Sequence, residues 1–397
     1  MNLSGKVPAA GSGASGNRLL RLTPDCSPKR LEEPCMYDRS TDELFVLNTR
    51  ALSFLEGCGR GAPMPDSPDD RAFVSTCLEE GILELADEPA ARKLHLRQSP
   101  VPSLRYLLLH VTDRCNLKCR HCFLGEAGHS ELSLPEVAAI ADQFESMQGL
   151  RLLVSGGEPL LHSSFWEIND YLRRKDVRVV LLTNGTLIDK EAASRLVAQE
   201  VQISIDGMRE SHDHIRGWGS FERSLDAIKH VTAAGIDVSI ATMIHAKNID
   251  EFDMMEEMVR DLGVREWSID MPSATGRLAE NTDLLVNPDV AGPLLGRSFG
   301  GAIHEPLPGF ACGAHLMAVM ADGRVARCGF YADEPVGSIE EGLEPCWQKV
   351  SRISLSDLEC DCQFVEECRG GCRFRARGYN KPYGPDLCQC YRYGVIE

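Results

Sequence analysis

Apolar, strand-like segments alternate with amphipathic, helix-like segments from Leu104 to about Asp270. This alternation is typical of βα units, because parallel strands are joined by helical crossovers. We therefore predict an α/β fold, a partial (β/α)6 TIM barrel, over residues 104–300. Its strands are expected at 104–111, 150–154, 177–182, 201–205, 236–244 and 265–269.

The helices of this region carry start signals and a buried stripe. Ser133 precedes Glu136 by three residues, and Asn248 precedes Glu251 by the same spacing. A polar oxygen can then cap the first turn while the glutamate bonds back, so both places are predicted helix N-termini. The buried stripe of a further helix is expected at Phe221, Leu225, Ile228 and Val231.

The segment before the barrel has a different composition. Residues 1–18 are rich in Gly, Ser and Ala and are predicted to form a disordered tail. Residues 19–95 are expected to form a small winged-helix-like α+β domain, with a hairpin turn at 38–42 and two helical patterns. The second pattern ends at Gly81, a plausible C-cap. A linker with several prolines, 88–102, leads into the barrel.

The segment from about 306 to 397 is Cys- and Gly-rich and contains few long apolar runs. It is expected to lack a large hydrophobic core and to need bound clusters as cross-links. Nine of the 16 cysteines lie beyond position 311, and three more lie within eight residues of each other. Because this clustering is unlike that of scattered structural thiols, it favours metal binding over disulfides.

Charge and hydropathy limit the partners. A formal net charge of −17 disfavours nucleic-acid binding, which needs a surplus of Lys and Arg. There is no run of about 18 apolar residues and no basic-then-apolar N-terminus, so neither a membrane span nor a secretory signal is predicted. The expected location is the cytoplasm.

The first predicted strand leads into a loop with C-x3-C-x2-C spacing, formed by Cys115, Cys119 and Cys122. Sites on barrels of this type form at the C-terminal ends of the strands. Three thiolates can hold three irons of a [4Fe–4S] cluster and leave the fourth iron open to another ligand. A structural zinc site is the alternative, although zinc usually takes four ligands in paired spacings.

This spacing resembles the signature of the radical S-adenosylmethionine (SAM) superfamily. The resemblance implies that the open iron binds SAM and that an electron from the cluster cleaves SAM to a 5′-deoxyadenosyl radical. The radical then abstracts hydrogen from a substrate. A reducing partner such as a flavodoxin or a ferredoxin is expected, and no further catalytic residue is identified.

Later segments agree with this resemblance. Gly156-Gly157-Glu158-Pro159 is similar to the family's GGEP motif, in which the backbone and Glu158 would receive the SAM ammonium group. Arg216 resembles the arginine that pairs with the SAM carboxylate in related enzymes. The SAM-binding residues implied in this way are Phe123, Gly156, Gly157, Glu158, Thr183, Asn184, Ser204, Asp206 and Arg216.

The C-terminal cysteines resemble the SPASM extension of radical SAM enzymes, which binds auxiliary iron–sulfur clusters. The residues implied for a first auxiliary cluster are Cys312, Cys328 and Cys372. Those implied for a second are Cys360, Cys362 and Cys368, with either Cys388 or Cys390. Cys360 lies one residue too close to Cys362 for the family pattern. A single auxiliary cluster or a structural zinc stays an alternative.

The N-terminal unit resembles the peptide-recognition element fused to enzymes that modify ribosomally made peptides. The resemblance implies a maturase of such a precursor peptide, whose leader adds a strand to the element's sheet. Hydrogen abstraction would lead to a crosslink or another oxidative change. Two alternatives are a radical SAM enzyme that modifies tetrapyrrole side chains in alternative haem synthesis, and a non-catalytic iron–sulfur or peptide-binding module.

Overall fold

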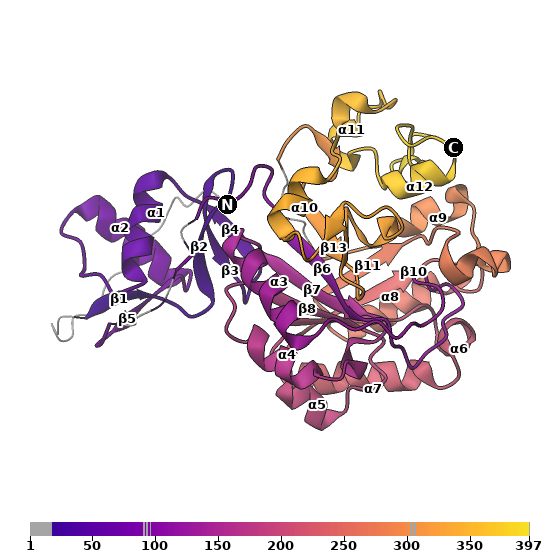
Figure 1. Ribbon diagram of the computed structural model, residues 1–397, viewed down its shortest axis with the longest axis horizontal. Coiled ribbons are helices and arrows are strands. Elements are labelled where there is room, and N and C mark those ends of the chain that lie inside the picture. The colour runs from indigo at the N-terminus through magenta and orange to yellow at the C-terminus, as the bar shows by residue number, and fades with distance from the viewer. Residues whose placement is uncertain are drawn as a thin grey trace.

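The computed structural model describes residues 18–89, 92, 94–95, 97–301, 304 and 307–396. The predicted tail therefore lies outside the described residues, except for its last position. An N-terminal unit stands to one side of a central barrel, and the C-terminal segments cover part of that barrel (Figure 1). Among the described residues, no helix is long and apolar enough to cross a membrane.

Six parallel strands form the barrel in the sheet order β11-β10-β9-β8-β7-β6. The predicted α/β fold is confirmed, and each predicted strand is present to within two residues. The strands are β6 (Tyr106–Thr112), β7 (Arg151–Gly156), β8 (Arg178–Thr183), β9 (Glu200–Ser204), β10 (Asp237–Met243) and β11 (Glu266–Asp270). The helices between and after them are α3 (Leu134–Ser146), α4 (Phe165–Leu172), α5 (Lys190–Arg195), α6 (Arg209–Arg216), α7 (Ser220–Ala233), α8 (Phe252–Asp261) and α9 (Pro288–Leu295).

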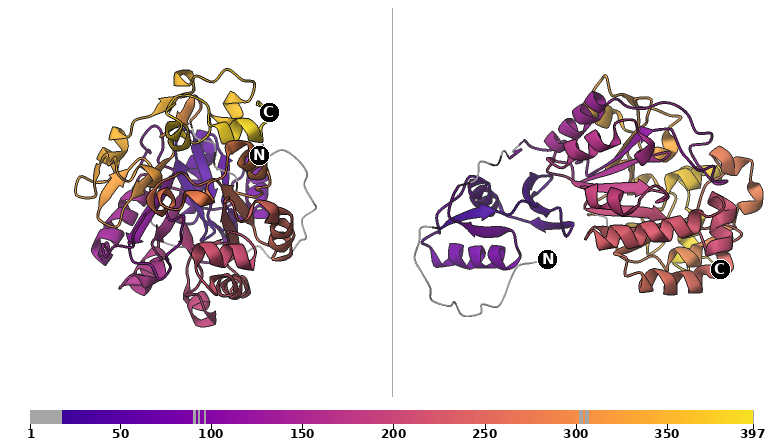
Figure 2. Two further views of the ribbon diagram at one scale, coloured as in Figure 1. Left: turned by 90° about the vertical axis from the view of Figure 1, so that its right-hand side faces the viewer. Right: turned by 90° about the horizontal axis from the view of Figure 1, so that it is seen from below.

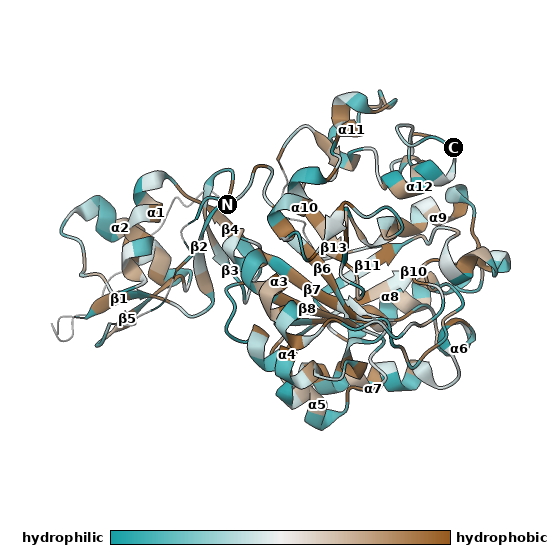
Figure 3. Cartoon of the chain, viewed as in Figure 1, coloured by the Kyte–Doolittle hydropathy of each residue, from teal (hydrophilic) through white to brown (hydrophobic). Residues whose placement is uncertain are grey.

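The barrel core follows the two-residue period of its strands. In β6, Leu107, Leu109 and Val111 are fully buried and belong to the core cluster shared with the helices. The apolar strands lie inside, and the polar faces of the helices lie outside (Figure 3). On α7 the predicted stripe is buried apart from Leu225, which is partly buried against the same core.

Both predicted helix starts are present, since a 3-10 helix begins directly after Asn248 and leads into α8, but only the first has the predicted cap. Ser133 and Glu136 form the expected capping box at the start of α3. Asn248 makes no such bond: its amide donates to the carbonyl oxygens of Asp206 and Met243. Glu251 accepts from the Met208 amide on another loop, and α8 begins one residue later. Long-range partners outcompeted the local cap, which sequence spacing does not reveal.

The N-terminal unit contains the predicted hairpin, formed by β3 (Pro34–Asp38) and β4 (Glu43–Val46). The carboxylate of Asp38 accepts from the Ser40 amide and hydroxyl, which closes the turn. Strand β2 (Cys26–Arg30) adds to β3, while β1 (Leu19–Leu22) pairs with β5 (Leu83–Ala86) in a separate sheet. Two helices, α1 (Thr49–Cys58) and α2 (Pro68–Glu79), complete the unit.

The turn at 39–42 is held against the N-terminal ends of the barrel strands. Arg178, at the start of β8 and fully buried, donates to the carbonyl oxygens of Arg39 and Ser40 at 2.7 and 2.9 Å. Arg151, at the start of β7, forms an ion pair with Asp42. The N-terminal unit is therefore anchored at the end of the barrel where the parallel strands begin.

The C-terminal segment continues the barrel sheet. Strand β13 (Leu316–Val319) lies parallel beside β6, and β14 (Arg324–Ala326) and β15 (Gly337–Ser338) follow it. Met317, Val319 and Trp347 of this segment belong to the barrel core. The expectation that the segment lacks a large hydrophobic core is therefore wrong, because it shares the core of the barrel. Its other elements are β12 (Phe310–Cys312), β16 (Ile353–Ser354), α10 (Leu343–Lys349), α11 (Val365–Cys368), α12 (Arg373–Gly378) and α13 (Leu387–Arg392). Short 3-10 helices lie at Pro159–Leu161, Ile249–Glu251, Gly276–Ala279, Thr282–Leu284, Gly329–Tyr331 and Leu355–Asp357.

Candidate active site

A cavity of about 1000 Å³ opens at the C-terminal ends of the barrel strands and extends under the C-terminal segment. Last residues of β7, β8, β9 and β10 line its floor: Gly156, Thr183, Ser204 and Met243. The opposite wall comes from the segment after Cys328 and from α12. This volume is in the range of small-molecule and cofactor sites.

The three cysteines of the loop after β6 all line this cavity. Burial raises the pKa of the Cys119 thiol to about 11, and the neighbouring Cys122 and Cys115 raise it further while Arg216 opposes them. The loop is shaped by its own backbone, since the Leu117 amide donates to Cys115 Sγ at 3.5 Å. The structure thus brings together the three thiols that the spacing predicts.

The donor set fits a cluster of several irons. A [4Fe–4S] cluster takes each cysteine at a separate iron. Three thiols on one cavity wall suit that arrangement, and they would be deprotonated on binding iron.

Two glycines bring β7 close beneath the cysteine loop. A Cβ atom on Gly156 would lie 2.3 Å from the carbonyl oxygen of Thr112, and the φ of Gly156 is +150°. A Cβ atom on Gly157 would lie 2.4 Å from the carbonyl oxygen of Arg114. The Glu158 amide donates to that same oxygen at 2.8 Å. Only glycine permits this approach of two backbones.

Glu158 supports the neighbouring loop. It is fully buried, and its carboxylate accepts from the Thr183 hydroxyl at 2.8 Å and from the Asn184 amide at 2.9 Å. Burial raises its pKa to about 7. Asn184 in turn donates to the side chain of Asn116 in the cysteine loop. Glu158 does not line the cavity whereas Gly157 does, so its expected contact with SAM stays a prediction.

Arg216 lines the cavity beside the cysteines and is held by a buried carboxylate. Its Nε donates to Asp206 at 2.6 Å, and Nε2 of His121 lies 3.1 Å from the same oxygen. Asp206 is fully buried and does not line the cavity. Burial opposes its charge, but Arg216 and His121 more than compensate and hold its pKa well below the usual range. Asp206 therefore positions Arg216, and sequence reasoning missed His121 although it stands inside the cysteine triplet.

Aromatic rings form the wall that faces the C-terminal segment. Phe123 is 39% exposed and lies 5.6 Å, centroid to centroid, from Phe330, which stacks on Phe374 at 5.4 Å. The ion pair between Arg377 and Glu334 stands in the same lining. Sequence reasoning missed Phe330 and Phe374, although each follows a cysteine by two residues.

The C-terminal cysteines form two groups. Burial raises the pKa of Cys328 to about 11, and Cys312 and Cys372 lie close enough to raise it further. Cys390, with a pKa of about 11 for the same reason, has three neighbours in the second group. These are Cys360, Cys362 and Cys368.

Cys388 stands apart from both groups. It is fully buried in the barrel core, and its sulfur lies 3.1 Å from the Met271 sulfur. Of the two cysteines between which the sequence left the choice open, only Cys390 lies beside the second group.

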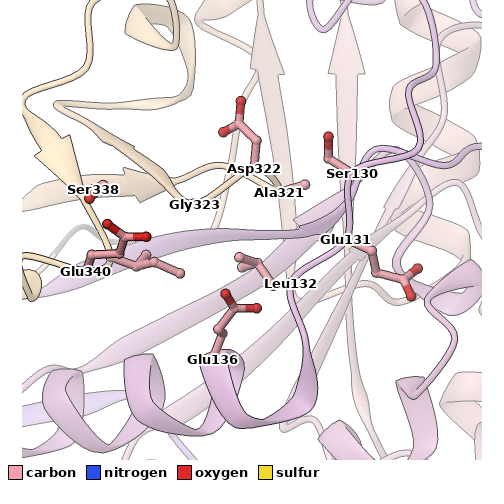
Figure 4. Close-up of a pocket in the computed structure, with 10 residues that line it drawn as sticks. Ser130, Glu131, Leu132, Glu136, Ala321, Asp322, Gly323, Ser338 and Glu340 are labelled. Carbon is pink, nitrogen blue, oxygen red and sulfur yellow. The ribbon is translucent and has the colours of Figure 1, made fainter.

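A smaller hollow of about 360 Å³ adjoins the cavity, and Asp322 lines both. Figure 4 shows the carboxylates of Glu131, Glu136, Asp322 and Glu340 around it. Much of this charge is already engaged, since Glu136 caps α3 and Asp322 pairs with Arg324 at 2.6 Å.

Comparisons with known proteins identify this architecture. A model of the radical SAM superfamily matches residues 109–259. Mycofactocin maturase MftC of Mycolicibacterium smegmatis is 30% identical over 306 residues, which are 67% of this chain and 77% of that protein. The chain belongs to the radical SAM superfamily. Enzymes of this superfamily use SAM and a [4Fe–4S] cluster, which are therefore its cofactors; held by Cys115, Cys119 and Cys122, they would supply a hydrogen-abstracting radical.

Other radical SAM proteins align with different shares of the chain. The antilisterial bacteriocin subtilosin biosynthesis protein AlbA of Bacillus subtilis is 35% identical over 332 residues, 75% of this chain and 73% of that protein. The AdoMet-dependent heme synthase of Nitratidesulfovibrio vulgaris is 32% identical over 207 residues, 50% and 56% of the two chains. Streptococcus suis SuiB, solved with its precursor peptide SuiA, shares the fold: the TM-score is 0.67 at 13% identity, over 94% of this chain and 100% of that one.

Proposed function

We propose that this radical SAM enzyme abstracts hydrogen from a ribosomally made precursor peptide and thereby leads to a crosslink or another oxidative modification. MftC of Mycolicibacterium smegmatis and AlbA align over two thirds or more of both chains, whereas the heme synthase aligns over about half. The match to two maturases along most of the chain, together with the fold shared with SuiB, supports a peptide over a tetrapyrrole. The N-terminal unit is the part of the chain that would recognise the leader of the peptide.

The free edge of β4 is the observation that carries this proposal. β4 is an outer strand of the sheet β2-β3-β4, and Val46 on it is 62% exposed. The opposite edge is covered, since the Arg30 amide of β2 donates to the Gln148 side chain of the barrel. Proteins usually protect exposed strand edges with charges or prolines. An edge that pairs with no other strand in the described part of the chain and carries an exposed valine suits the addition of a peptide strand.

The register of β3 and β4 identifies the backbone groups that the proposal assigns to the leader. The Leu47 amide donates to the Pro34 carbonyl oxygen, so this residue pair faces inward, toward β3. Because inward and outward amides alternate along an antiparallel strand, the amides of Leu44 and Val46 face outward. These two N–H groups are the proposed partners of the leader backbone.

The cavity would receive the residue to be modified. The row formed by Phe123, Phe330 and Phe374 gives that residue an apolar wall. Arg216, oriented by Asp206, is proposed to bind the SAM carboxylate. Gly156 and Gly157, which line the cavity, are also assigned to SAM. Thr183, Asn184 and Ser204 are also assigned to SAM.

The two C-terminal cysteine groups are proposed to hold auxiliary iron–sulfur clusters. We assign Cys312, Cys328 and Cys372 to one cluster, and Cys360, Cys362, Cys368 and Cys390 to the other. Three ligands in the first group leave one iron open to a further ligand, whereas four complete the second. A flavodoxin or ferredoxin is the proposed source of electrons, which together with reduced thiols points to the cytoplasm.

Replacing Val46 with proline tests leader recognition. Proline removes one outward N–H and leaves the inward ladder to β3 intact, because an edge strand tolerates it at such a position. With a short precursor peptide as substrate, which we expect to be encoded by a neighbouring gene, KM should rise about tenfold or more. Cleavage of SAM in the absence of peptide should stay unchanged. Mass spectrometry of the peptide and 5′-deoxyadenosine release measure the two quantities.

Val46→Thr is the matched control, since it keeps the N–H and changes only the side chain. If KM is unchanged in Val46→Pro while the N-terminal unit stays folded, the leader does not bind at β4. If the wild-type enzyme leaves the peptide unaltered but binds a porphyrin with a shifted Soret band, the tetrapyrrole alternative replaces the proposal.

A further inference from the structure

His110 is a buried histidine near the C-terminal end of β6, and it is 1% exposed. Neither of its ring nitrogens has a hydrogen-bond partner within the described part of the chain. Burial lowers its pKa to about 4, so the ring is neutral near pH 7 and has one donor and one acceptor nitrogen. A buried polar group without a partner is unfavourable for the free protein and requires an explanation.

The side chain of His110 points into the barrel. Its neighbours along the strand, Leu109 and Val111, belong to the core shared with the helices, and successive residues of a strand face opposite sides. In the parallel sheet His110 is paired with Ser155 of β7, which lines the large cavity. Met320, directly after β13 on the other side of β6, lines it as well. The imidazole therefore lies in the inward-facing layer, directly behind the cavity wall.

Two residues of the cavity lining, Phe123 and Gly329, cover the imidazole. The rings of His110 and Phe123 meet edge to face with their centroids 6.1 Å apart. A Cβ atom on Gly329 would lie 3.6 Å from Nε2 of His110, 3.7 Å from Cε2 of Phe123 and 3.0 Å from Cδ2 of Leu108. Nε2 is therefore the ring nitrogen on the side of Gly329.

The glycine at position 329 keeps the space in front of Nε2 open. Gly329 is the first residue of the 3-10 helix Gly329–Tyr331, a conformation that other residues adopt as well. Its φ is not positive, so the backbone does not require glycine there. A side chain at this position would fill the space among Leu108, His110 and Phe123. An unpartnered imidazole and an open approach to it thus occur at the same place.

We propose that Nε2 of His110 hydrogen-bonds a backbone amide of the substrate next to the carbon that loses hydrogen, after the Phe123 ring has moved aside. The amide N–H donates to the imidazole, or the amide carbonyl oxygen accepts from it. This contact holds the reacting carbon in place and takes part in no bond cleavage. The inference rests on the proposed function and adds the residue that orients the reacting part of the peptide.

The contact at His110 is separate from the proposed leader site. The N-terminal unit stands beyond the opposite end of the barrel, where β7 and β8 begin (Figure 2). Loss of leader binding should therefore raise KM. Loss of the contact at His110 should instead lower kcat for peptide modification, and more of the SAM cleavage should then occur without modification.

Replacing His110 tests the contact in the holoenzyme with the precursor peptide. In His110→Leu, the amount of modified peptide per 5′-deoxyadenosine released should fall about tenfold or more, because the reacting carbon is no longer held. The melting temperature should not fall, since an apolar side chain replaces an unpartnered polar one. His110→Gln, whose amide reaches the place of Nε2, should restore most of the ratio. His110→Asn, whose amide reaches only the place of Nδ1, should not.

Gly329→Ala tests the approach to Nε2 while the imidazole stays in place. Its methyl group should lower the same ratio, and iron analysis should show the wild-type iron content. His315→Leu is the control, because His315 lies beside the other end of β6 and does not line the cavity. It should keep the wild-type ratio.

A wild-type ratio in His110→Leu would overturn the proposal. Equal losses in His110→Leu and His110→Gln with lower melting temperatures would overturn it too, because His110 would then be a structural residue. If the wild-type enzyme cleaves SAM but leaves every peptide unaltered, the proposed function fails, and the role of His110 fails with it. That result is distinct from the other two, in which the wild type modifies the peptide.

Discussion

At the scale of single residues, glycine is required at positions 156 and 157 for different reasons. Gly156 has a φ of +150°, which side chains with a Cβ rarely adopt, and also touches Thr112. Gly157 has no such φ, but a methyl group there would meet the carbonyl oxygens of Arg114 and Asp113 at 2.4 and 2.8 Å. A substitution at Gly157 therefore disturbs the cysteine loop only by steric contact.

Gly157→Ala should displace the Arg114 backbone and with it Cys115. We expect less iron after anaerobic reconstitution and a fall in SAM cleavage of about tenfold or more, because small displacements in a positioned site are costly. Iron analysis and 5′-deoxyadenosine release measure both. Gly57→Ala on α1, where nothing lies within 4 Å, is the control and should be neutral or stabilising. Full iron loading in Gly157→Ala would show that the cysteine loop accommodates the methyl group without losing the cluster.

The sequence indicated which residues belong to the site more reliably than what each of them does there. The family resemblance implies that Asp206 and Glu158 contact SAM. Both are fully buried, and their carboxylates hold Arg216 and Thr183, so a direct contact with SAM stays a prediction for each. Which groups touch a ligand and which support those groups depends on side-chain direction, and the spacing of a motif does not encode that direction.

At the scale of elements, α13 shows how two cysteines in one short helix can differ. Residues two apart point to roughly opposite faces of a helix. Cys388 faces the barrel core and Met271, whereas Cys390 faces Cys360, Cys362 and Cys368. Asp386, the N-cap of α13, also binds the Cys372 amide at 2.8 Å and so joins this helix to the first cysteine group.

Cys390→Ser should lower the iron content of the C-terminal segment, because it removes a proposed cluster ligand. Cys388→Ala should keep the iron content and lower the free energy of unfolding by about 1–3 kcal/mol, since it opens a small core cavity. Iron and sulfide analysis and thermal unfolding separate the two effects. The reverse pattern, iron lost only in the Cys388 variant, would exchange the two assignments.

The elements that sequence predicted well are those with a long periodic pattern. All six barrel strands have such a pattern together with a helix after or before them, so their bounds were close. Strand β13 has only Leu316-Met317-Ala318-Val319 within a Cys- and Gly-rich segment, and its pairing with β6 joins residues about 210 positions apart. A short apolar run does not indicate which strand it pairs with. The core that β13 shares with the barrel was therefore not predicted.

At the scale of the molecule, the proposed leader site and the cavity lie at opposite ends of the barrel. The N-terminal unit is anchored where β7 and β8 begin, and the cavity lies where they end. A peptide that passes along β6 must span seven residues of extended chain, at about 3.3 Å each.

Precursors with fewer than about seven residues between the leader and the modified residue should therefore lose modification while keeping affinity. A series of peptides with shortened spacers, followed by mass spectrometry and binding, tests this. Spacers lengthened with Gly and Ser should retain activity, because loop-closure entropy grows slowly with length. Efficient modification with a spacer of two or three residues would place the leader elsewhere.

The buried contact between the N-terminal unit and the barrel also predicts that the free energy of unfolding depends on pH. Lys29 on β2 is 2% exposed, and its ammonium donates to the carbonyl oxygens of Gly149 and Asp176 at 3.0 and 2.7 Å. Burial lowers its pKa from 10.5 to about 8. Between these two values the unfolded chain holds a proton that the folded chain has released, so stability rises with pH in that window.

Relative to Lys29→Met, the wild type should gain up to about 3 kcal/mol in free energy of unfolding between pH 8 and 10.5. Below pH 8 the difference should be constant, because the lysine is charged in both states. Urea unfolding of the two holoenzymes at matched pH values gives this difference, and the subtraction removes groups such as Tyr106, whose pKa burial raises to about 12. A flat difference up to pH 10.5 would mean that water reaches Lys29 and that the two units are less tightly joined than the buried contacts indicate.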